Sequence, residues 1–226
     1  MTTALLAYTL IRSRRKTVAL IVQSDGSLVV RAPLRLARRS IDQFVVSKAE
    51  WIDKHRQAVK AHPEAPPAHR YAAGELFWFL GQRYPLEIVP STAAPLLELK
   101  DGKFRLAARA VPRAAAVFET WYRRQARLVL SERVALRAAF HMLTVSGVRI
   151  SSARTRWGSC SSRGSLSFTW RLVLAPMEVV DYVIVHELAH LQVHNHSPAF
   201  WKEVASLMPD YAPRKQWLKL NGRILI

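Results

Sequence analysis

The chain has 226 residues, half of them hydrophobic, so it is long enough for one large domain or two small ones. Its single cysteine, Cys160, excludes an intramolecular disulfide and suits a reducing compartment. No apolar run reaches the roughly 18–20 residues that a membrane span needs, and the basic residues near the start follow the apolar ones, the reverse of a signal peptide. We therefore expect a cytoplasmic protein without a membrane partner.

The formal net charge of +18 indicates contact with polyanions or acidic surfaces. The basic residues are scattered in small groups, without the aromatic-basic platform that binds single strands. The main groups are Arg12, Arg14, Arg15 and Lys16, then Arg31, Arg35, Arg38 and Arg39, then Arg123, Arg124 and Arg127. A solvated basic face explains the charge equally well, so contact with a nucleotide, a nucleic acid or the ribosome stays open.

Three short strands are predicted at the start of the chain, before a single helix. Asp25-Gly26 indicates a tight hairpin turn between the second and third strands, and Pro33 ends the third. Arg14-Arg15-Lys16 is expected at the tip of a hairpin between the first and second strands. The predicted strands span residues 5–12, 17–23 and 27–31.

The helix is expected to start at Ser40, as its N-cap, and to run to about Lys60. Its apolar residues recur at helical spacing: Ile41, Phe44, Val45, Trp51 and Ile52. The proline-containing stretch at residues 61–68 predicts an extended linker. His55, His62 and His69 lie on or beside this stretch without a metal-ligand spacing, and we expect them to be solvated.

Two further hairpins are predicted before residue 110. Gly81-Gln82-Arg83 separates the first pair of strands, and Asp101-Gly102 separates the second. The four strands span residues 76–80, 84–89, 96–100 and 103–107. Residues 1–110 are therefore predicted to form a β-rich N-terminal module that carries one helix, with substrate gating or docking as its expected role.

A long helix is predicted from Pro112 to about Leu143, because apolar residues form one stripe with charged residues between them. It should be the scaffold on which a second, functional helix packs. Strands are expected at residues 145–150 and 165–170, separated by a stretch rich in Ser, Gly and Arg. A strand beside the functional helix can offer an unpaired edge to an extended peptide.

The functional helix is predicted to follow Pro176, which suits a first helical turn. Its sequence from Met177 onward is apolar nearly all round, so the helix should be buried. It ends in His186-Glu187-Leu188-Ala189-His190, an H-E-x-x-H motif that places two imidazoles one turn apart on the same face. Both can bind one zinc ion, while Glu187 reaches a metal-bound water as general base. Two satisfied core histidines are the alternative interpretation.

The third ligand follows from helix geometry. On an unbroken helix His194 would sit about 12 Å along the axis from His186, too far for one ion. The helix must therefore end first: Asn195 suits the left-handed conformation that closes helices, and Ser197-Pro198 opens a new helix to about Met208. His196 lies in the reversal between the helices and can fold back on the site. His194 is the runner-up ligand, and Glu203 is a weaker candidate.

The chain resembles the bacterial YgjP-like metallopeptidase-domain proteins, distant kin of the SprT and WLM zinc proteases. The resemblance rests on residues 156–162, residues 181–190, Asn195-His196-Ser197 and Phe200-Trp201, and on residues 11–17 and 44–52 near the start. It implies a zincin-type catalytic domain with His186, His190 and His196 as zinc ligands and Glu187 as base. The chain matches the family pattern at all four positions.

Predictions can also be made for Arg156, Trp157, Cys160 and Tyr211. Arg156 is the best candidate for a cation that stabilises an oxyanion or holds an acidic substrate group, with a surface ion pair as the alternative. Trp157 and its neighbours are expected to pack and turn the chain, and Cys160 to pack. Tyr211, in the tail that caps the core, could donate a hydrogen bond to an oxyanion.

The sequence thus predicts an α+β zinc hydrolase with a module at residues 1–110 and a zincin-like metallopeptidase domain at residues 111–226. In that domain the motif helix packs on the long scaffold helix and a small sheet, and a peptide or protein is the expected substrate. Two alternatives stay open: a metal-dependent nucleotide phosphohydrolase and a non-catalytic, zinc-stabilised module that binds nucleic acid. The first lacks a Gly-rich phosphate cradle and a carboxylate cluster for Mg²⁺.

Overall fold

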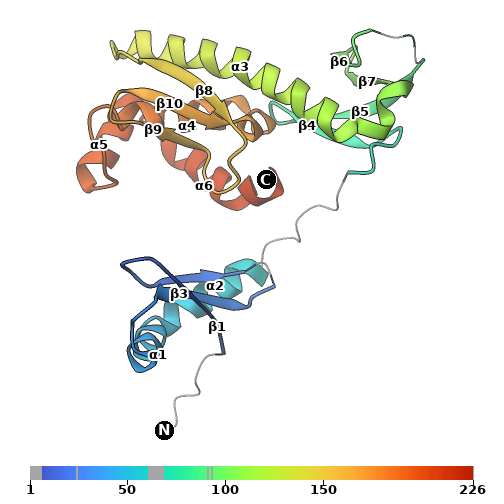
Figure 1. Cartoon of the computed structure of the whole chain (residues 1–226). Helices are drawn as coiled ribbons and strands as arrows, with labels where there is room; N and C mark the ends of the chain where they lie inside the picture. Colours follow the sequence, from blue (N-terminus) through green and yellow to red (C-terminus); the bar gives the residue numbers. More distant parts are fainter. Residues whose placement is uncertain (1–6, 24, 61–68, 91, 93, 226) are drawn as a thin grey trace. The chain divides into compact units, whose positions relative to one another are not determined.

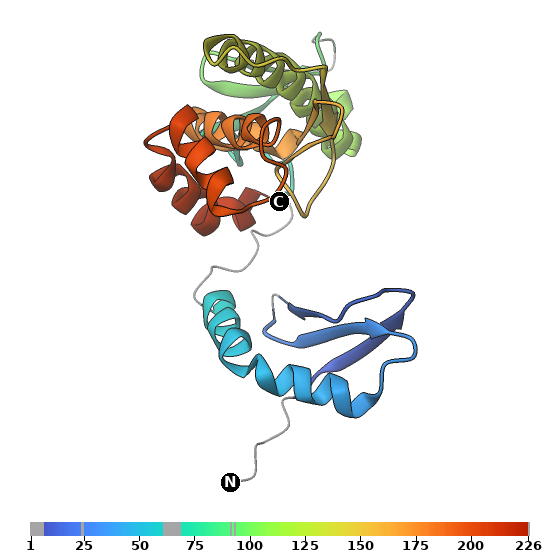
Figure 2. The ribbon, with the colours of Figure 1, turned by 90° about the vertical axis from the view of Figure 1, so that its left-hand side faces the viewer.

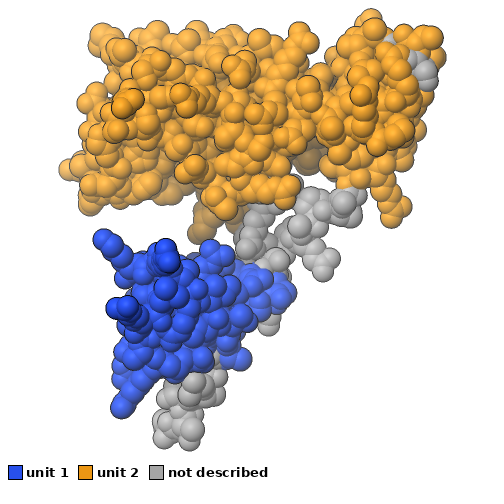
Figure 3. Space-filling view, viewed as in Figure 1, with its two compact units in different colours: residues 1–66 blue, residues 67–226 orange. Residues whose placement is uncertain are grey.

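The computed structural model describes residues 7–23, 25–60, 69–90, 92 and 94–225, and has an α+β fold with three small sheets (Figure 1). The chain forms two compact units, residues 1–66 and 67–226 (Figure 3). No helix in the described ranges combines the length and apolarity needed to cross a membrane. The predicted linker at residues 61–68 lies outside the described residues.

The first unit is a three-stranded sheet packed on two helices. Strands β1 (Thr9–Ser13), β2 (Ala19–Val22) and β3 (Leu28–Pro33) lie in the order β1-β3-β2. The predicted hairpin at Asp25-Gly26 is present, since β2 and β3 pair antiparallel and Gly26 has a φ of +81°. The predicted hairpin with Arg14-Arg15-Lys16 at its tip is wrong: β1 pairs parallel with β3. Turn-forming residues indicate pairing between strands that follow each other in the sequence. They do not reveal the pairing of β1 with β3.

The single helix predicted from Ser40 to Lys60 is two helices, α1 (Arg38–Ser47) and α2 (Ala49–Lys60), which Figure 2 shows in succession. Ser40 lies inside α1, whose N-cap is Ala37. At the interruption, the Ser47 hydroxyl donates a hydrogen bond to the Phe44 carbonyl at 2.8 Å, the kind of side-chain bond that competes with regular helix. Buried residues of both helices still face one core with the sheet: Leu28, Val30, Ala32, Ile41, Val45 and Ile52.

The second unit begins with a four-stranded sheet in the order β4-β5-β7-β6. Its strands are β4 (Leu76–Phe79), β5 (Gln82–Val89), β6 (Leu97–Lys100) and β7 (Lys103–Ala107). The turn between β4 and β5 is at Leu80 and Gly81, both with positive φ, so it is one residue earlier than expected. This sheet was expected in the N-terminal module, but its buried residues share a core with the long helix. The division between units falls at residues 66 and 67, whereas the expected boundary was at residue 110.

The long scaffold helix is α3 (Ala114–Phe140), which follows the 3-10 helix η1 (Ala108–Arg113). It runs beside both the β4–β5 region and the second sheet of this unit, as Figure 1 shows. The Tyr122 hydroxyl donates to the Trp78 carbonyl at 2.6 Å and joins α3 to β4. The helix therefore connects the two sheets through one core.

The third sheet has the order β8-β10-β9, with strands β8 (Gly147–Ser151), β9 (Gly158–Cys160) and β10 (Ser165–Thr169). Strands β8 and β10 were predicted and pair parallel. Strand β9 was not, because three residues inside a Ser/Gly-rich stretch carry no detectable periodicity. It pairs antiparallel with β10 and forms an edge of the sheet beside the motif helix.

Three helices complete the unit: α4 (Met177–Ala189), α5 (Pro198–Leu207) and α6 (Tyr211–Asn221), with the short 3-10 helices η2 (Trp170–Leu174) and η3 (Gly222–Leu225). Helix α4 is buried as expected and contacts α3, α5 and α6. It ends at Ala189 with His190 as its C-cap, well before His194, and α5 starts after the N-cap Ser197. Asn195 closes the reversal differently than expected: its side-chain oxygen accepts the Ser197 amide at 3.1 Å, and its φ is not positive.

Candidate metal centre

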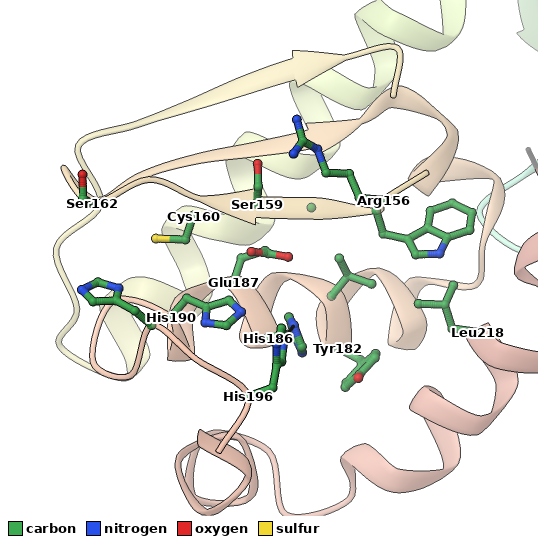
Figure 4. Close-up of a pocket in the computed structure, with 14 residues that line it drawn as sticks. Arg156, Ser159, Cys160, Ser162, Tyr182, His186, Glu187, His190, His196 and Leu218 are labelled. Carbon is green, nitrogen blue, oxygen red and sulfur yellow. Dashed lines mark hydrogen bonds between the residues drawn. The ribbon is translucent and has the colours of Figure 1, made fainter. Parts of the chain in front are cut away.

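Helix α4, which carries the H-E-x-x-H motif, places its polar residues at the wall of a cavity of about 650 Å³ in the second unit. Glu187 is only 4% exposed, on an α4 whose Ile184 and Leu188 are fully buried. His186 and His190 lie one turn apart, with ring centroids 5.0 Å from each other. Figure 4 shows Glu187 between the helix and strand β9, and the imidazoles of His186 and His190 on the same side of the helix.

The reversal after α4 returns a third imidazole to this wall. The Nδ1 atom of His190 lies 3.0 Å from the Val193 carbonyl, which fixes the ring against the turn. The Nε2 atoms of His196 and His186 are 3.1 Å apart. One potential ligand atom from each of His186, His190 and His196 lies within 4.8 Å of the others. The structure thus brings together His186, His190 and His196, the predicted ligand set.

These residues fit a divalent metal ion. Ligand nitrogens at about 2.0–2.1 Å from tetrahedral zinc are about 3.3 Å from one another, close to the His186–His196 separation. The hydrogen bond from His190 Nδ1 to a backbone carbonyl selects the tautomer that leaves Nε2 free to coordinate. Among the described residues, Nδ1 of His186 and Oε2 of Glu187 are buried without a hydrogen-bond partner. A set of neutral imidazole donors beside a buried carboxylate suits zinc chemistry.

The pKa shifts of the site residues bear on their ability to bind a metal ion. Burial lowers the pKa of His186 to about 3, with further lowering by the neighbouring His190 and His196. Burial also lowers the pKa of His190. Both imidazoles are therefore neutral near pH 7, and their lone pairs are available. Burial raises the pKa of Glu187 to about 7, although the Arg156 guanidinium opposes that rise.

Aromatic rings of helix α5 pack against the imidazoles. The ring of Phe200, which is fully buried at the start of α5, stacks on His190 at a centroid distance of 4.4 Å. It meets His186 edge-on at 4.9 Å. The Nζ atom of Lys215 lies 3.5 Å above the ring of Trp201, the next residue of α5. Helix α5 therefore packs against the part of the cavity wall that the histidines form.

Strand β9 forms the opposite side of the cavity, and Gly158, Ser159 and Cys160 all line it. Cys160 donates a hydrogen bond to the Ser161 carbonyl, and burial raises the pKa of its thiol. This supports the expectation of a packing role. Arg156 also lines the cavity, but in Figure 4 its guanidinium lies across β9 from the three imidazoles. That placement suits a contact with substrate at the cavity rim better than a contact with an oxyanion beside the histidines.

The other predicted candidates, His194, Glu203 and Tyr211, lie outside the histidine group. His194 lines the cavity but is not part of the histidine group, and Glu203 is not among the lining residues. Tyr211 is also outside the lining, because its ring is stacked between Tyr182 and Trp201. The tyrosine that lines the cavity is Tyr182, which was not predicted as a site residue. Its position four residues before His186, on the same face of the helix, was the available signal.

Comparison with known proteins places these observations in a family. A search of the curated proteins finds no match. Among solved structures, the chain is similar to the metallopeptidase zymogen of Pyrococcus abyssi abylysin, with 20% identity and a TM-score of 0.37 over 42% of this chain and 94% of that one. Residues 16–221 match the YgjP-like family, which is described as a metallopeptidase domain and so implies hydrolysis with a divalent metal. The match spans most of both units, and the chain belongs to the YgjP-like metallopeptidase-domain family.

Proposed function

We propose that this protein is a zinc-dependent metallopeptidase whose ion is held by His186, His190 and His196 and whose general base is Glu187. The observation that carries the proposal is the convergence of the three imidazoles within 4.8 Å, beside a carboxylate that is 4% exposed. Membership of a metallopeptidase-domain family supports a peptide or protein as the substrate.

When bound at such a site, a zinc ion supplies Lewis acidity, lowering the pKa of a water molecule towards 7 and polarising a carbonyl group. Glu187 accepts a proton from the attacking water and delivers it to the leaving amine as the peptide C–N bond breaks. Its burial keeps the pKa of the carboxyl close to working pH, as an efficient proton carrier requires. A positive ion nearby would lower that pKa and favour the basic form.

The substrate is proposed to lie along strand β9. This strand is an edge of its sheet, and among the described residues no strand pairs with its outer side, which could therefore pair with an extended peptide. The same strand lines the cavity opposite the histidines, so a peptide paired there would pass the site. Arg156, at the rim, is proposed to hold an acidic group of the substrate.

The test is Glu187→Gln, assayed on denatured proteins with Zn²⁺, Mn²⁺ or Mg²⁺ added. The amide keeps the shape of the side chain but cannot accept the proton, so we expect hydrolysis to fall by about 10²–10⁴-fold. Metal content, measured on the same preparations, should stay at one ion per chain. Retained hydrolysis in the variant would remove Glu187 as the base.

A nucleotide phosphohydrolase is the second candidate, and one observation favours it. Glu187 is the sole carboxylate among the described residues that line the cavity, which also carries Arg156 and His194. The Arg156 guanidinium can pair with a phosphate group. Nucleoside triphosphates in the same assay panel separate the two functions. Salt-sensitive binding of nucleic acid that is indifferent to Glu187→Gln would instead indicate the non-catalytic module.

A further inference from the structure

The side chain of Glu187 lies against strand β9 at Gly158. A Cβ atom built at this position would lie 2.5 Å from Oε1, 2.6 Å from Cγ and 2.7 Å from Cδ of Glu187. These are its three nearest atoms, and all belong to one side chain. The carboxylate and its stem therefore lie directly against the main chain of the strand.

Gly158 is needed for its lack of volume, not for its conformation. Its φ is outside the left-handed region, so any residue could adopt this backbone. Ordinary contacts of a Cβ atom begin at 3.4 Å, so a methyl group at Gly158 would have to displace Glu187 by about 1 Å.

Contacts with β10 and with Gly222 hold the strand in place. Gly158 pairs with Phe168 of β10, which is fully buried. The neighbouring Trp157 carbonyl accepts the Thr169 amide at 3.0 Å, and the Trp157 ring packs against the main chain at Gly222. Moving β9 away from the helix would break the sheet and disturb this core contact.

Helix α4 is equally fixed from its other side. Ile184 and Leu188 are fully buried, and Asp181 accepts hydrogen bonds from Arg133 and Arg137 of α3. The displacement therefore falls on the side chain of Glu187, the softest of the parts in contact.

We propose that Gly158 is the positioning residue for Glu187: the missing side chain at this position of β9 is the slot that holds the carboxylate facing the cavity. The inference rests on the proposed role of Glu187 as the base. It adds that strand β9, which is proposed to bind the substrate, also positions the base. The same stretch of main chain would therefore fix both the substrate and Glu187.

The first experiment compares Gly158→Ala with Gly147→Ala in the full chain. Gly147 is in β8 of the same sheet, and a Cβ atom there meets nothing within 4 Å. We expect Gly158→Ala to lower kcat about 100-fold, as misplacement of a reacting group by about 1 Å does. KM and Zn²⁺ affinity, measured by chelator competition, should change little, and Gly147→Ala should match the wild type. A wild-type kcat in Gly158→Ala, or a loss of Zn²⁺ affinity as large as the loss of kcat, would overturn the proposal.

The second experiment needs no activity. Denaturant midpoints of the metal-free wild type, Gly158→Ala, Glu187→Ala and the double variant form a thermodynamic cycle. If the methyl group collides with Glu187, it should lower the midpoint in the wild type but not in Glu187→Ala. Equal shifts in both backgrounds contradict the proposal. Should Gly158→Ala fail to fold, the double variant is expected to fold, and its failure too would contradict the proposal.

The two experiments also separate this inference from the proposed function. If the wild type cleaves no peptide, the proposed function fails, whereas the cycle still decides whether Gly158 and Glu187 are in contact. If the wild type is active and the cycle is additive, the positioning role fails alone.

Discussion

At the scale of single residues, the proposed metal centre depends on where helix α4 ends. His190 is the C-cap of the helix and bonds through Nδ1 to the Val193 carbonyl, so the chain reverses immediately after the second imidazole. This lets His196, ten residues after His186, bring its Nε2 atom to 3.1 Å from that of His186. The neighbouring His194 lines the same cavity without joining the group.

The contrast between these histidines gives a prediction for metal affinity. His196→Ala removes one of the proposed ligands and should weaken Zn²⁺ binding by more than the roughly 10–100-fold that loss of an outer hydrogen-bond partner costs. His194→Ala is the control and should bind Zn²⁺ like the wild type. Chelator competition on both variants measures this. The reverse order of affinities would make His194 the third ligand.

At the scale of elements, helix α4 is held in place by a charged contact with the scaffold helix. Asp181 is 5% exposed and accepts hydrogen bonds from Arg133 at 2.8 Å and from Arg137 at 2.6 Å. Burial alone would raise the pKa of Asp181, but the hydrogen bonds from both arginines outweigh it and leave that pKa below 3.8. The ionised carboxylate is therefore the form that the fold stabilises.

This contact predicts a pH-dependent stability. Because the pKa of Asp181 is lower in the folded state, its contribution is complete well above pH 3.8 and is lost as the pH falls through the lowered value. Asp181→Asn should lower the free energy of unfolding at pH 7 by about 2 kcal/mol, less than for a fully buried pair because the arginines are partly exposed. The difference should shrink as the pH falls below 4. Urea titrations at several pH values measure it, and a difference that persists at the lowest pH would contradict the ionic origin.

The β4–β5 turn supports α4 from its start. The Leu80 amide donates to the Val173 carbonyl at 2.7 Å, and a Cβ atom at Gly81 would lie 2.8 Å from the Cα atom of Pro176, the N-cap of α4. The turn thus sits against the backbone where the motif helix begins. A glycine is favoured here for two reasons. A side chain would collide with Pro176, and the φ of +78° disfavours other residues.

Two glycine variants separate the steric contact with Pro176 from the backbone strain at positive φ. Gly81→Ala should lower the free energy of unfolding by roughly 2–4 kcal/mol, from backbone strain plus overpacking. Gly102→Ala has the same strain, with a φ of +73°, but nothing within 4 Å of the added Cβ atom, and should cost about 1 kcal/mol. Chemical denaturation of both variants tests this. Equal losses would show that the contact with Pro176 contributes nothing.

At the scale of the whole molecule, every residue of the proposed site belongs to the second unit. The large buried cluster draws its residues from residue 77 onward, whereas the buried cluster of the first unit ends at Ile52. Each unit thus has its own core, as expected of parts that can fold independently.

The corresponding prediction concerns the isolated second unit. Residues 67–226, produced alone, should fold cooperatively and bind one Zn²⁺ ion with the affinity of the full chain. Calorimetric titration and thermal unfolding of this fragment test it. A fragment that folds but binds Zn²⁺ at least tenfold more weakly would show that the first unit contributes to the site.

Features set by neighbouring residues could be predicted from the sequence. The H-E-x-x-H spacing, the need for α4 to end before His194, the new helix at Pro198 and the turns at Gly26 and Gly102 all follow from local geometry. Helical rise and turn chemistry act over a few residues, so these features do not depend on the rest of the fold. The identity of the histidine group is therefore contained in the sequence itself.

Features that join distant residues were decided by the tertiary structure. The parallel pairing of β1 with β3, the strand at Gly158 and the packing of β4–β7 with α3 depend on contacts between segments far apart in the chain. So does the fit of Gly158 against Glu187, for which the sequence carries no local signal. Burial and steric exclusion arise only when distant segments pack together, so the histidine group could be predicted from the sequence, but the close approach of Gly158 to Glu187 could not.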